Sequence, residues 1–268
     1  MENRGDSNRI TREYFDSILL EARYWDSDLP STAVTLFGKT FETPIATAAL
    51  SHLDNVCPGG AVKMAAGAAT VKIIKPLEDD RAIFAKIEHA CRAGATAVGM
   101  DIDHAFSASG GYDNVLGLQM HAKTSAQLRE YVQASTLPFV VKGVLSVRDA
   151  EICMEAGVGG IVVSHHHGIM PSAVPPLMLL PEIVKVTDHR IPVFVDCGVE
   201  SGVDAFKALA LGADAVCVGR HLMRYLKDEG GVGARIREMT GELCSVMART
   251  GAKSPREIDP AVLHFRAF

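Results

Sequence analysis

A regular alternation of short apolar runs and amphipathic segments, beginning at Pro44, limits most strongly how this chain can fold. The apolar runs have the length of buried strands, and the segments between them carry apolar side chains at helical spacing. Seven strands are predicted, at residues 44–49, 70–75, 96–102, 139–144, 160–164, 192–197 and 214–219. Helices are predicted between them, at residues 61–69, 80–93, 125–134, 147–156, 176–186 and 203–211. Repeated strand–helix units without a break in composition favour one α/β barrel of the TIM (β/α)8 type.

The predicted strands are one fewer than the eight of such a barrel. The shortfall lies between Ala61 and Thr70, where one short helix runs almost directly into the next strand. One interpretation is that this βα unit is truncated. The alternative is that a hairpin predicted at residues 33–41, or the segment 105–117, supplies the missing pairing.

The residues before the barrel are predicted to form a separate cap. Residues 1–9 are polar and are expected to be frayed, whereas residues 11–25 have apolar side chains at helical spacing. Residues 33–41 have the pattern of a hairpin. The predicted organisation is therefore an N-terminal helix and hairpin capping the barrel (1–43), followed by the barrel with its C-terminal helices (44–268).

Composition excludes several classes of partner and favours a cytoplasmic protein. A formal net charge of -5 and a pI near 6.1 give no basic surface for nucleic acid or anionic membranes, so neither partner is expected. The six cysteines are scattered singly, without ligand spacing, as in a reducing compartment. No apolar run approaches the length of a membrane span, and the first residues lack the apolar core of a signal peptide.

Polar residues follow the predicted strands at the end where parallel α/β folds bind ligands. The most conspicuous group is Ser164, His165, His166 and His167, because histidine exchanges a proton near neutral pH. The other strand ends carry Ser51 and His52; Lys75; Asp101, Asp103 and His104; Lys142; Asp196; and Gly219 and Arg220. The glycine-containing segments 196–202 and 218–220 also suit a phosphate, which such barrels hold after their last two strands.

Five motifs of the C-terminal half, in order and spacing, resemble the FMN-dependent α-hydroxy acid dehydrogenases and oxidases, the group of glycolate and lactate oxidase. They are Phe139-Val-Val-Lys-Gly-Val-Leu-Ser146, Gly160-Ile-Val-Val-Ser-His-His-His-Gly168, Ile191-Pro-Val-Phe-Val-Asp-Cys-Gly198, Asp204-Ala-Phe-Lys-Ala-Leu-Ala-Leu-Gly-Ala213 and Val218-Gly-Arg220. The segments 93–103 and 37–49 resemble further parts of the family, so the resemblance covers most of the chain. It implies a barrel that binds FMN.

The resemblance also implies a role for individual residues. His166 matches the catalytic base, Asp103 the carboxylate that orients it, and Lys142 the ammonium beside flavin N1 and O2. The remaining cofactor contacts that it implies are Ala48 and Ala49 beside the ring, Asp101 and Ser164 at the ring, and Asp196, Gly198, Gly219 and Arg220 at the ribityl chain and phosphate.

Several positions depart from the family pattern. Ile169 stands where an arginine clamps the substrate carboxylate, and Glu200 where an arginine binds phosphate. Asp101 replaces a threonine beside the flavin, and a tyrosine is replaced near Lys75. The segment 105–121 is a shortened form of the loop that covers the substrate. A substrate held in another way is therefore expected, with Lys75, His104 and His165 as candidate contacts.

Three functions remain open from the sequence. The first is an FMN-dependent oxidoreductase that acts on a small hydroxylated or carbonyl compound, with proton abstraction by His166. The second is a flavin- or phosphate-binding barrel without turnover. The third is a metal-dependent lyase or hydrolase that uses the cluster His165–His167 with Asp101 and Asp103. The first two functions need no metal site, and none is predicted for them. A homo-oligomer is expected from the resemblance.

Overall fold

The computed structural model describes residues 5–50, 53, 56–65 and 71–266. Its contacts divide the chain into two compact units. Unit 1 comprises Met1–Ile10 and Val71–Val193, and unit 2 comprises Thr11–Thr70 and Phe194–Phe268. Within the described ranges, no helix has both the length and the apolar character that crossing a lipid bilayer requires.

Unit 1 is built on four parallel strands that pair in the order β10-β9-β6-β5. Their bounds are β5 (Lys72–Ile74), β6 (Val98–Asp101), β9 (Phe139–Val144) and β10 (Gly160–Val163). Every residue of β6, β9 and β10 is buried, as expected for parallel strands that are covered on both faces. The register places Asp101 opposite Lys142 and Lys142 opposite Val162, so the carboxyl ends of neighbouring strands lie at one edge.

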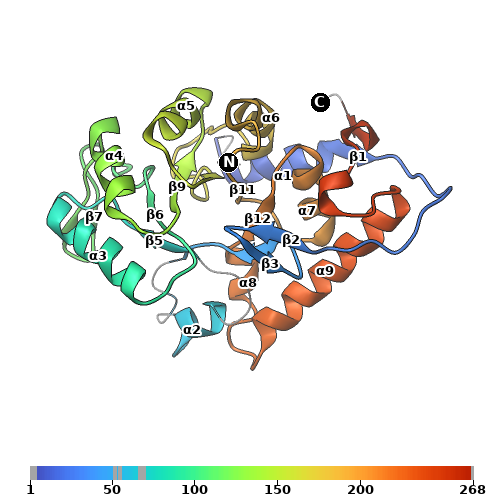
Figure 1. Cartoon of the computed structure of the whole chain (residues 1–268), viewed down its shortest axis with the longest axis horizontal. Helices are drawn as coiled ribbons and strands as arrows, with labels where there is room; N and C mark the ends of the chain where they lie inside the picture. Colours follow the sequence, from blue (N-terminus) through green and yellow to red (C-terminus); the bar gives the residue numbers. More distant parts are fainter. Residues whose placement is uncertain (1–4, 51–52, 54–55, 66–70, 267–268) are drawn as a thin grey trace. The chain divides into compact units, whose positions relative to one another are not determined.

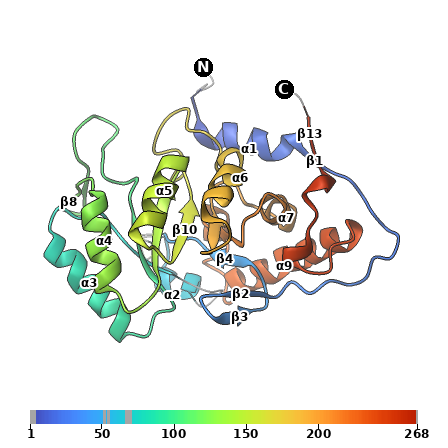
Figure 2. The ribbon, with the colours of Figure 1, turned by 45° about the horizontal axis from the view of Figure 1, so that its top comes forward.

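Four helices of unit 1 pack side by side along its strands (Figures 1 and 2). They are α3 (Asp80–Arg92), α4 (Ser125–Ala134), α5 (Val147–Ala156) and α6 (Pro176–Thr187). Polar side chains fix where three of them begin, because Asp79, Thr124 and Ser146 each accept a hydrogen bond from a backbone N–H of the first turn. A short antiparallel hairpin, β7 (Asn114–Val115) and β8 (Leu118–Gln119), lies between β6 and α4 in the chain.

Unit 2 contains three parallel strands in the order β4-β12-β11. They are β4 (Ile45–Thr47), β11 (Val193–Val195) and β12 (Ala215–Val218), and the helices are α2 (Gly60–Ala65), α7 (Gly202–Ala210), α8 (Arg220–Met223) and α9 (Gly231–Arg249). Helices α7 and α9 approach each other closely at Gly202, where a Cβ would lie 2.1 Å from the carbonyl oxygen of Met239. A side chain at this position would therefore force the two helices apart.

Two small antiparallel sheets complete unit 2. Strands β2 (Val34–Leu36) and β3 (Lys39–Phe41) form the predicted hairpin, whose Phe37 ring stacks on Phe194 of β11 at a centroid distance of 5.9 Å. Strand β1 (Ile18–Leu20) pairs with β13 (Leu263–Phe265), which follows two short 3-10 turns, Pro255–Glu257 and Pro260–Val262.

The predicted alternation of strands and helices is confirmed. The fold is an α/β fold of the TIM-barrel type in which one βα repeat is truncated. All seven predicted strands are present and parallel to their neighbours within each unit. The hairpins β2–β3 and β7–β8 form sheets of their own, so neither supplies an eighth barrel strand. The helix predicted at residues 61–69 is observed as Gly60–Ala65, and residues 66–70 lie outside the described part.

The prediction for the N-terminal residues was partly wrong. Residues 5–9 are not frayed, because α1 (Ser7–Ser17) begins within them and the Ser7 side chain is buried. The predicted helix at residues 11–25 ends at Ser17, where β1 begins, because Ile18 to Leu20 find a strand partner near the end of the chain. The division at residue 43 into a cap and a barrel stays a prediction.

Candidate functional site

The strand ends of unit 1 carry side chains of alternating charge. The Lys75 ammonium, just after β5, lies 2.6 Å from Oδ2 of Asp101, the last residue of β6. The other oxygen of Asp101 lies 3.3 Å from Nζ of Lys142 on β9. Lys142 in turn donates to Ser164 Oγ, after β10, at 3.4 Å. Four neighbouring strands therefore contribute to one connected group, which we call the unit 1 cluster.

Asp101 is ionised in this cluster although its side chain is only 3% exposed. Burial by itself raises the pKa of a carboxyl, because the charged form loses water. Here the charges of Lys142 and Lys75 outweigh burial, and the pKa of Asp101 is held below its usual value of 3.8. One buried carboxylate thus faces two ammonium groups.

His166 and Asp103 form a pair beside Lys142. Nδ1 of His166 lies 2.8 Å from Oδ1 of Asp103 and 3.4 Å from Nζ of Lys142. A nitrogen this close to a carboxylate oxygen keeps its proton, because a lone pair there would face negative charge. His166 therefore donates from Nδ1 to Asp103, and its Nε2 carries the lone pair that can accept a proton.

Gly143 allows Asp103 to lie against β9. The backbone of Gly143 has a φ of 95°, and a Cβ at this position would come within 2.5 Å of Cγ of Asp103. Both the left-handed conformation and the close approach require glycine. The Lys142–Gly143 dipeptide consequently serves the site twice, through the ammonium group and through the space for Asp103.

The loop after β10 holds His166 in a backbone conformation that is uncommon outside glycine. His166, His167 and Gly168 have φ values of 49°, 58° and 78° in succession. Hydrogen bonds stabilise the turn: Ser164 Oγ accepts from the N–H of His166, and Nδ1 of the buried His165 accepts from the N–H of Gly168. Successive left-handed residues maintained by such contacts are typical of functional sites.

The N-terminal segment of unit 1 holds the same loop from outside. Ser7 Oγ donates to the carbonyl of Met170 at 2.6 Å and accepts from the N–H of Ala173 at 3.0 Å. Asn8 Nδ2 donates to the carbonyl of His167 at 3.1 Å. The segment predicted to be frayed therefore supports the loop that carries His166.

A second histidine, His104, lies beside His166. The two rings meet edge to face with centroids 5.0 Å apart, and Nδ1 of His104 lies 3.1 Å from Oδ2 of Asp113. Burial, followed by the charges of Lys75 and His166, lowers the pKa of His104 below its usual value of 6.5. His104 is therefore neutral at neutral pH. Its buried Nδ1 makes no hydrogen bond within the described residues, although Asp113 lies close to it.

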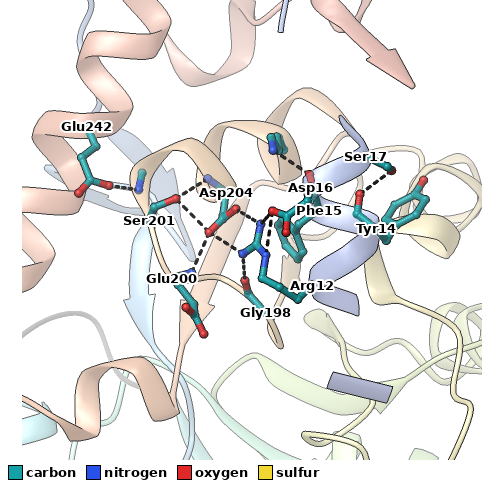
Figure 3. Close-up of polar contacts among 12 residues, drawn as sticks. Arg12, Tyr14, Phe15, Asp16, Ser17, Gly198, Glu200, Ser201, Asp204 and Glu242 are labelled. Carbon is teal, nitrogen blue, oxygen red and sulfur yellow. Dashed lines mark hydrogen bonds and ion pairs between the residues drawn. The ribbon is translucent and has the colours of Figure 1, made fainter. Parts of the chain in front are cut away.

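In unit 2, two guanidinium groups fix the segment 196–202, and Figure 3 shows the contacts of one of them, Arg12. Arg12 binds both oxygens of Asp204, at 3.1 and 2.8 Å, and donates to the carbonyl of Gly198 at 3.0 Å. Arg235 donates to the carbonyl of Glu200 at 2.9 Å. Asp204 also accepts from the N–H of Glu200 and the hydroxyl of Ser201. The exposed Glu200 carboxylate points away from the Arg12–Asp204 pair in Figure 3.

The predicted cofactor contacts of unit 2 lie at or near the ends of its three strands. Asp196 is buried after β11, and Gly219 follows β12 with Arg220 exposed beside it. A Cβ at Gly219 would lie 3.3 Å from Cβ of Ala48, and Ala48 donates its N–H to Val218. Ala49 is half-buried next to Ala48.

Three side chains at the strand ends of unit 1, Asp101, Asp103 and His166, form a group that could hold a metal ion. Ligand atoms of Asp101, Asp103 and His166 all lie within 4.8 Å of one another. However, Asp101 already faces the ammonium groups of Lys75 and Lys142, which repel a dication. This arrangement argues against the metal-dependent lyase or hydrolase that the sequence left open.

The structure brings together most of the predicted residues that lie in unit 1. Lys75, Asp101, Asp103, His104, Lys142, Ser164 and His166 form connected contacts. His165 is buried and holds the loop, and its predicted contact with substrate stays a prediction. Sequence reasoning missed Asp113, Ser7 and Asn8, because no motif or strand end marks them. Of the predicted strand-end residues, Ser51 and His52 lie outside the described part.

Comparison with known proteins identifies similar sequences. A sequence model of the FMN-dependent dehydrogenase family matches residues 103–265. Glycolate oxidase 3 of Arabidopsis thaliana is 44% identical over 127 residues, which are 46% of this chain and 34% of that protein. L-lactate oxidase of Roseobacter sp. (strain GAI101) is 39% identical over 150 residues, 55% of this chain and 40% of that protein. The matched segments thus span well under half of these relatives.

Solved structures are similar over almost the whole chain. A crystal structure of mandelate oxidase has a TM-score of 0.85 and 25% sequence identity, and the match covers 98% of this chain and 90% of that one. A mandelate oxidase variant solved with an FMN adduct also has a TM-score of 0.85, at 26% identity, covering 99% of this chain and 93% of that one.

Proposed function

Because the chain belongs to the FMN-dependent dehydrogenase family, we propose that it is an FMN-dependent oxidoreductase that acts on a small hydroxylated or carbonyl compound. The observation that carries this proposal is the His166–Asp103 pair beside the buried Lys142. In this pair, Asp103 fixes the tautomer of His166, whose Nε2 can accept a proton next to the positive charge of Lys142. The glycolate, lactate and mandelate oxidases to which the chain is similar act on hydroxy acids, which makes hydroxylated compounds the first class to test.

The unit 1 cluster suits the ring of FMN. A reduced flavin ring carries negative charge, and a binding site stabilises it with a nearby cation. Two ammonium groups, Lys75 and Lys142, face the buried carboxylate of Asp101 at these strand ends. Lys142 would hold the ring from β9, and Ser164 would contact it from β10.

The mechanism that we propose rests on proton transfer to His166. When bound, FMN supplies an acceptor for the hydrogen and electron pair that leave the carbinol carbon. Nε2 of His166 takes the hydroxyl proton, which completes the conversion of an alcohol into a carbonyl group. Asp103 keeps Nδ1 protonated and stabilises the imidazolium that results. The hydrogen bonds to the loop after β10 keep the ring in place while its charge changes.

For the phosphate of FMN we propose the strand ends of unit 2. Gly198 and Gly219 follow β11 and β12, and the exposed Arg220 guanidinium would provide a charge-assisted contact. The N–H groups of Glu200 and Gly202 already donate to Asp204 and Glu242, so the phosphate must use other donors. Asp196 would accept from the ribityl hydroxyls, and Ala48 and Ala49 stay predicted contacts of the cofactor.

A barrel that binds flavin without turnover is the second candidate. The observations in its favour are Ile169, in place of the arginine that clamps a carboxylate, and the exposed carboxylate of Glu200. The two candidates differ in one measurable property, because only an oxidoreductase lets a substrate reduce the bound flavin.

The test is the visible absorption spectrum of the purified protein with FMN, under anaerobic conditions, before and after adding hydroxy acids, alcohols and carbonyl compounds. We expect retained flavin and loss of its visible band with a substrate. His166→Ala should retain the flavin but slow bleaching by at least about 100-fold, since general base catalysis contributes roughly that much. His89→Ala, an exposed histidine on α3, is the matched control and should bleach normally. Retained flavin that no compound bleaches would favour the second candidate.

Lys142→Met tests the ring contact separately. Without the ammonium group, we expect weaker FMN binding and a lower reduction potential, because the negative charge of the reduced ring is no longer balanced. Flavin affinity and potential equal to those of the parent protein would remove Lys142 from the proposed site.

We also propose a homo-oligomer in the cytoplasm. All six cysteines are free thiols, in keeping with a reducing compartment. Trp25 and Leu29 are 95% and 85% exposed, and large apolar side chains at the surface are typical of interfaces. Light scattering of the eluting protein measures the assembly, and burial of Trp25 would appear as a change in its fluorescence on dilution.

A further inference from the structure

The turn at residues 166–168, which carries the proposed base, has a backbone conformation that strains two of its residues. His166, His167 and Gly168 have φ values of 49°, 58° and 78°. Glycine adopts this left-handed conformation freely, whereas a residue with a Cβ keeps it only where its surroundings hold it. The side chain of His167 is exposed, so its burial does not hold the turn. The conformation therefore depends on hydrogen bonds.

One peptide group of this turn is held at both of its polar atoms. It is the group between His167 and Gly168. Its N–H, on Gly168, donates to Nδ1 of the buried His165 at 2.9 Å. Its carbonyl oxygen, on His167, accepts from Nδ2 of Asn8 at 3.1 Å. Because a peptide group is planar, contacts at both ends fix its orientation, and the histidine side chain supplies one contact and Asn8 the other.

The amide of Asn8 is itself oriented by the residue that precedes α1. Its Nδ2 lies 3.3 Å from Oδ1 of Asp6 and 3.1 Å from the carbonyl oxygen of His167. Both neighbours are acceptors, so the NH2 group, and not the amide oxygen, faces them. The same oxygen of Asp6 accepts from the N–H of Asn8 at 2.9 Å. A Cβ at Gly168 would lie 3.0 Å from Nδ2 of Asn8, so this side chain also packs against the turn.

Resting on the function proposed above, we infer that Asn8 is a positioning residue for the proposed base, His166. Ser164 holds the peptide group before His166, and Asn8 helps to hold the one after His167. Without the contact from Asn8, the strained turn can relax, and the ring of His166 then leaves its place 2.8 Å from Asp103. A base that is misplaced in most molecules slows proton transfer in proportion.

Ser7 holds a different part of the same loop. Its hydroxyl contacts the carbonyl of Met170 and the N–H of Ala173, which lie beyond the turn. Asn8 instead contacts His167, the residue directly after the base. Loss of Ser7 is therefore expected to act on the stability of the loop, and loss of Asn8 on the geometry of the base.

The first experiment needs neither flavin nor substrate. Imidazole 15N shifts, measured by NMR at alkaline pH in the protein as purified, report how much of His166 has its proton on Nδ1, toward Asp103. We expect Asn8→Ala to raise the other tautomer about tenfold, the factor for one lost hydrogen bond. Asn8→Asp should do at least as much, because a carboxylate has the same shape but cannot donate. Gln133→Ala, at an exposed amide of α4, is the matched control and should change nothing.

Replacing His167 by glycine tests how Asn8 acts. Glycine adopts the left-handed conformation without strain, so the turn no longer needs the contact from Asn8. The double variant Asn8→Ala/His167→Gly should therefore return the tautomer of His166 to that of the parent protein. Amide exchange of the buried strand β9 should be the same in every variant, which separates a local change in the turn from loss of global stability.

The second experiment measures how fast glycolate, lactate and mandelate bleach the FMN-loaded protein under anaerobic conditions. For the compound that bleaches the parent protein, Asn8→Ala should lower the limiting rate about tenfold, and the double variant with His167→Gly should restore it. The affinity for FMN should stay that of the parent protein, because Asn8 is not among the proposed flavin contacts.

The outcomes separate this inference from the proposed function. A tautomer of His166 that Asn8→Ala leaves unchanged overturns the inference, and so does a change that His167→Gly does not reverse. A bleaching rate of Asn8→Ala equal to that of the parent protein also overturns it. A reversible change of tautomer in a protein that no compound bleaches supports the positioning by Asn8 and refutes the proposed function.

Discussion

Replacing Lys75 by methionine should destabilise the protein in a way that depends on pH. The substitution keeps a side chain of similar length but leaves Asp101, which is 3% exposed, without the ammonium group 2.6 Å away. Removing one partner of a buried ion pair typically costs about 3–5 kcal/mol because a charge stays buried without compensation. Here Lys142 still lies 3.3 Å from the other oxygen, so we expect about 2 kcal/mol at neutral pH.

The sign of the pH dependence follows from the lowered pKa of Asp101. A carboxyl whose pKa is lower in the folded state than in the unfolded state stabilises the fold above its unfolded pKa, and this contribution is lost as the pH falls through the folded pKa. For the parent protein the loss therefore occurs in acid, below 3.8. Without Lys75, burial acts against one cation instead of two, so the pKa of Asp101 rises. Once Asp101 is protonated in both proteins, the missing ammonium group no longer matters.

The assay is urea unfolding of the parent and Lys75→Met from neutral pH to about pH 3.5, with the difference in unfolding free energy as the readout. We expect a gap of about 2 kcal/mol at neutral pH that closes toward the acid end. Lys72→Met is the control, because Lys72 is exposed on β5, and it should change stability by less than about 0.5 kcal/mol. A gap that is independent of pH, or no gap at all, would refute the charge balance that we assign to the unit 1 cluster.

Three further substitutions test the packing and the polar contacts by the same unfolding measurement. Gly202→Ala should lower the free energy of unfolding by at least about 3 kcal/mol, because its Cβ would overlap Met239. Gly241→Ala on α9, where a Cβ would have nothing within 4 Å, should raise it by about 0.5–1 kcal/mol. Equal effects of the two substitutions would contradict the close approach of α7 and α9. Ser7→Ala should cost about 2 kcal/mol through two lost hydrogen bonds, and the exposed Ser109→Ala almost nothing. Asp204→Asn should cost about 3 kcal/mol because an amide cannot accept both Arg12 hydrogen bonds, and a neutral result would deny that pair a structural role.

The barrel strands were predictable because their signal is local. Strand β9 occupies the predicted residues 139–144. All of these residues are apolar except Lys142 and Gly143. The end of α1 was not predictable, because Ile18 and Leu19 continue the helical spacing of the preceding residues. Only their pairing with Phe265 and His264, far along the chain, makes them a strand.

The candidate site likewise contains residues that could be predicted from the sequence and residues that could not. Asp101, Lys142 and His166 could be predicted because they stand at or near the carboxyl ends of neighbouring buried strands, which meet at one edge. Asp113 gave no signal, because it reaches His104 only through the fold of the loop that contains β7 and β8. Ser7 gave no signal in the sequence either, because its hydrogen-bond partners lie in the loop after β10.

The contact of Ser7 with that loop also governs when the site can form during synthesis. Ser7 leaves the ribosome 163 residues before its partner Met170. At the usual rates of translation this delay is roughly ten to thirty seconds. Throughout that time the hydroxyl of Ser7 lacks this partner. The loop that carries His166 can therefore reach its final geometry only after both segments have been synthesised and have met.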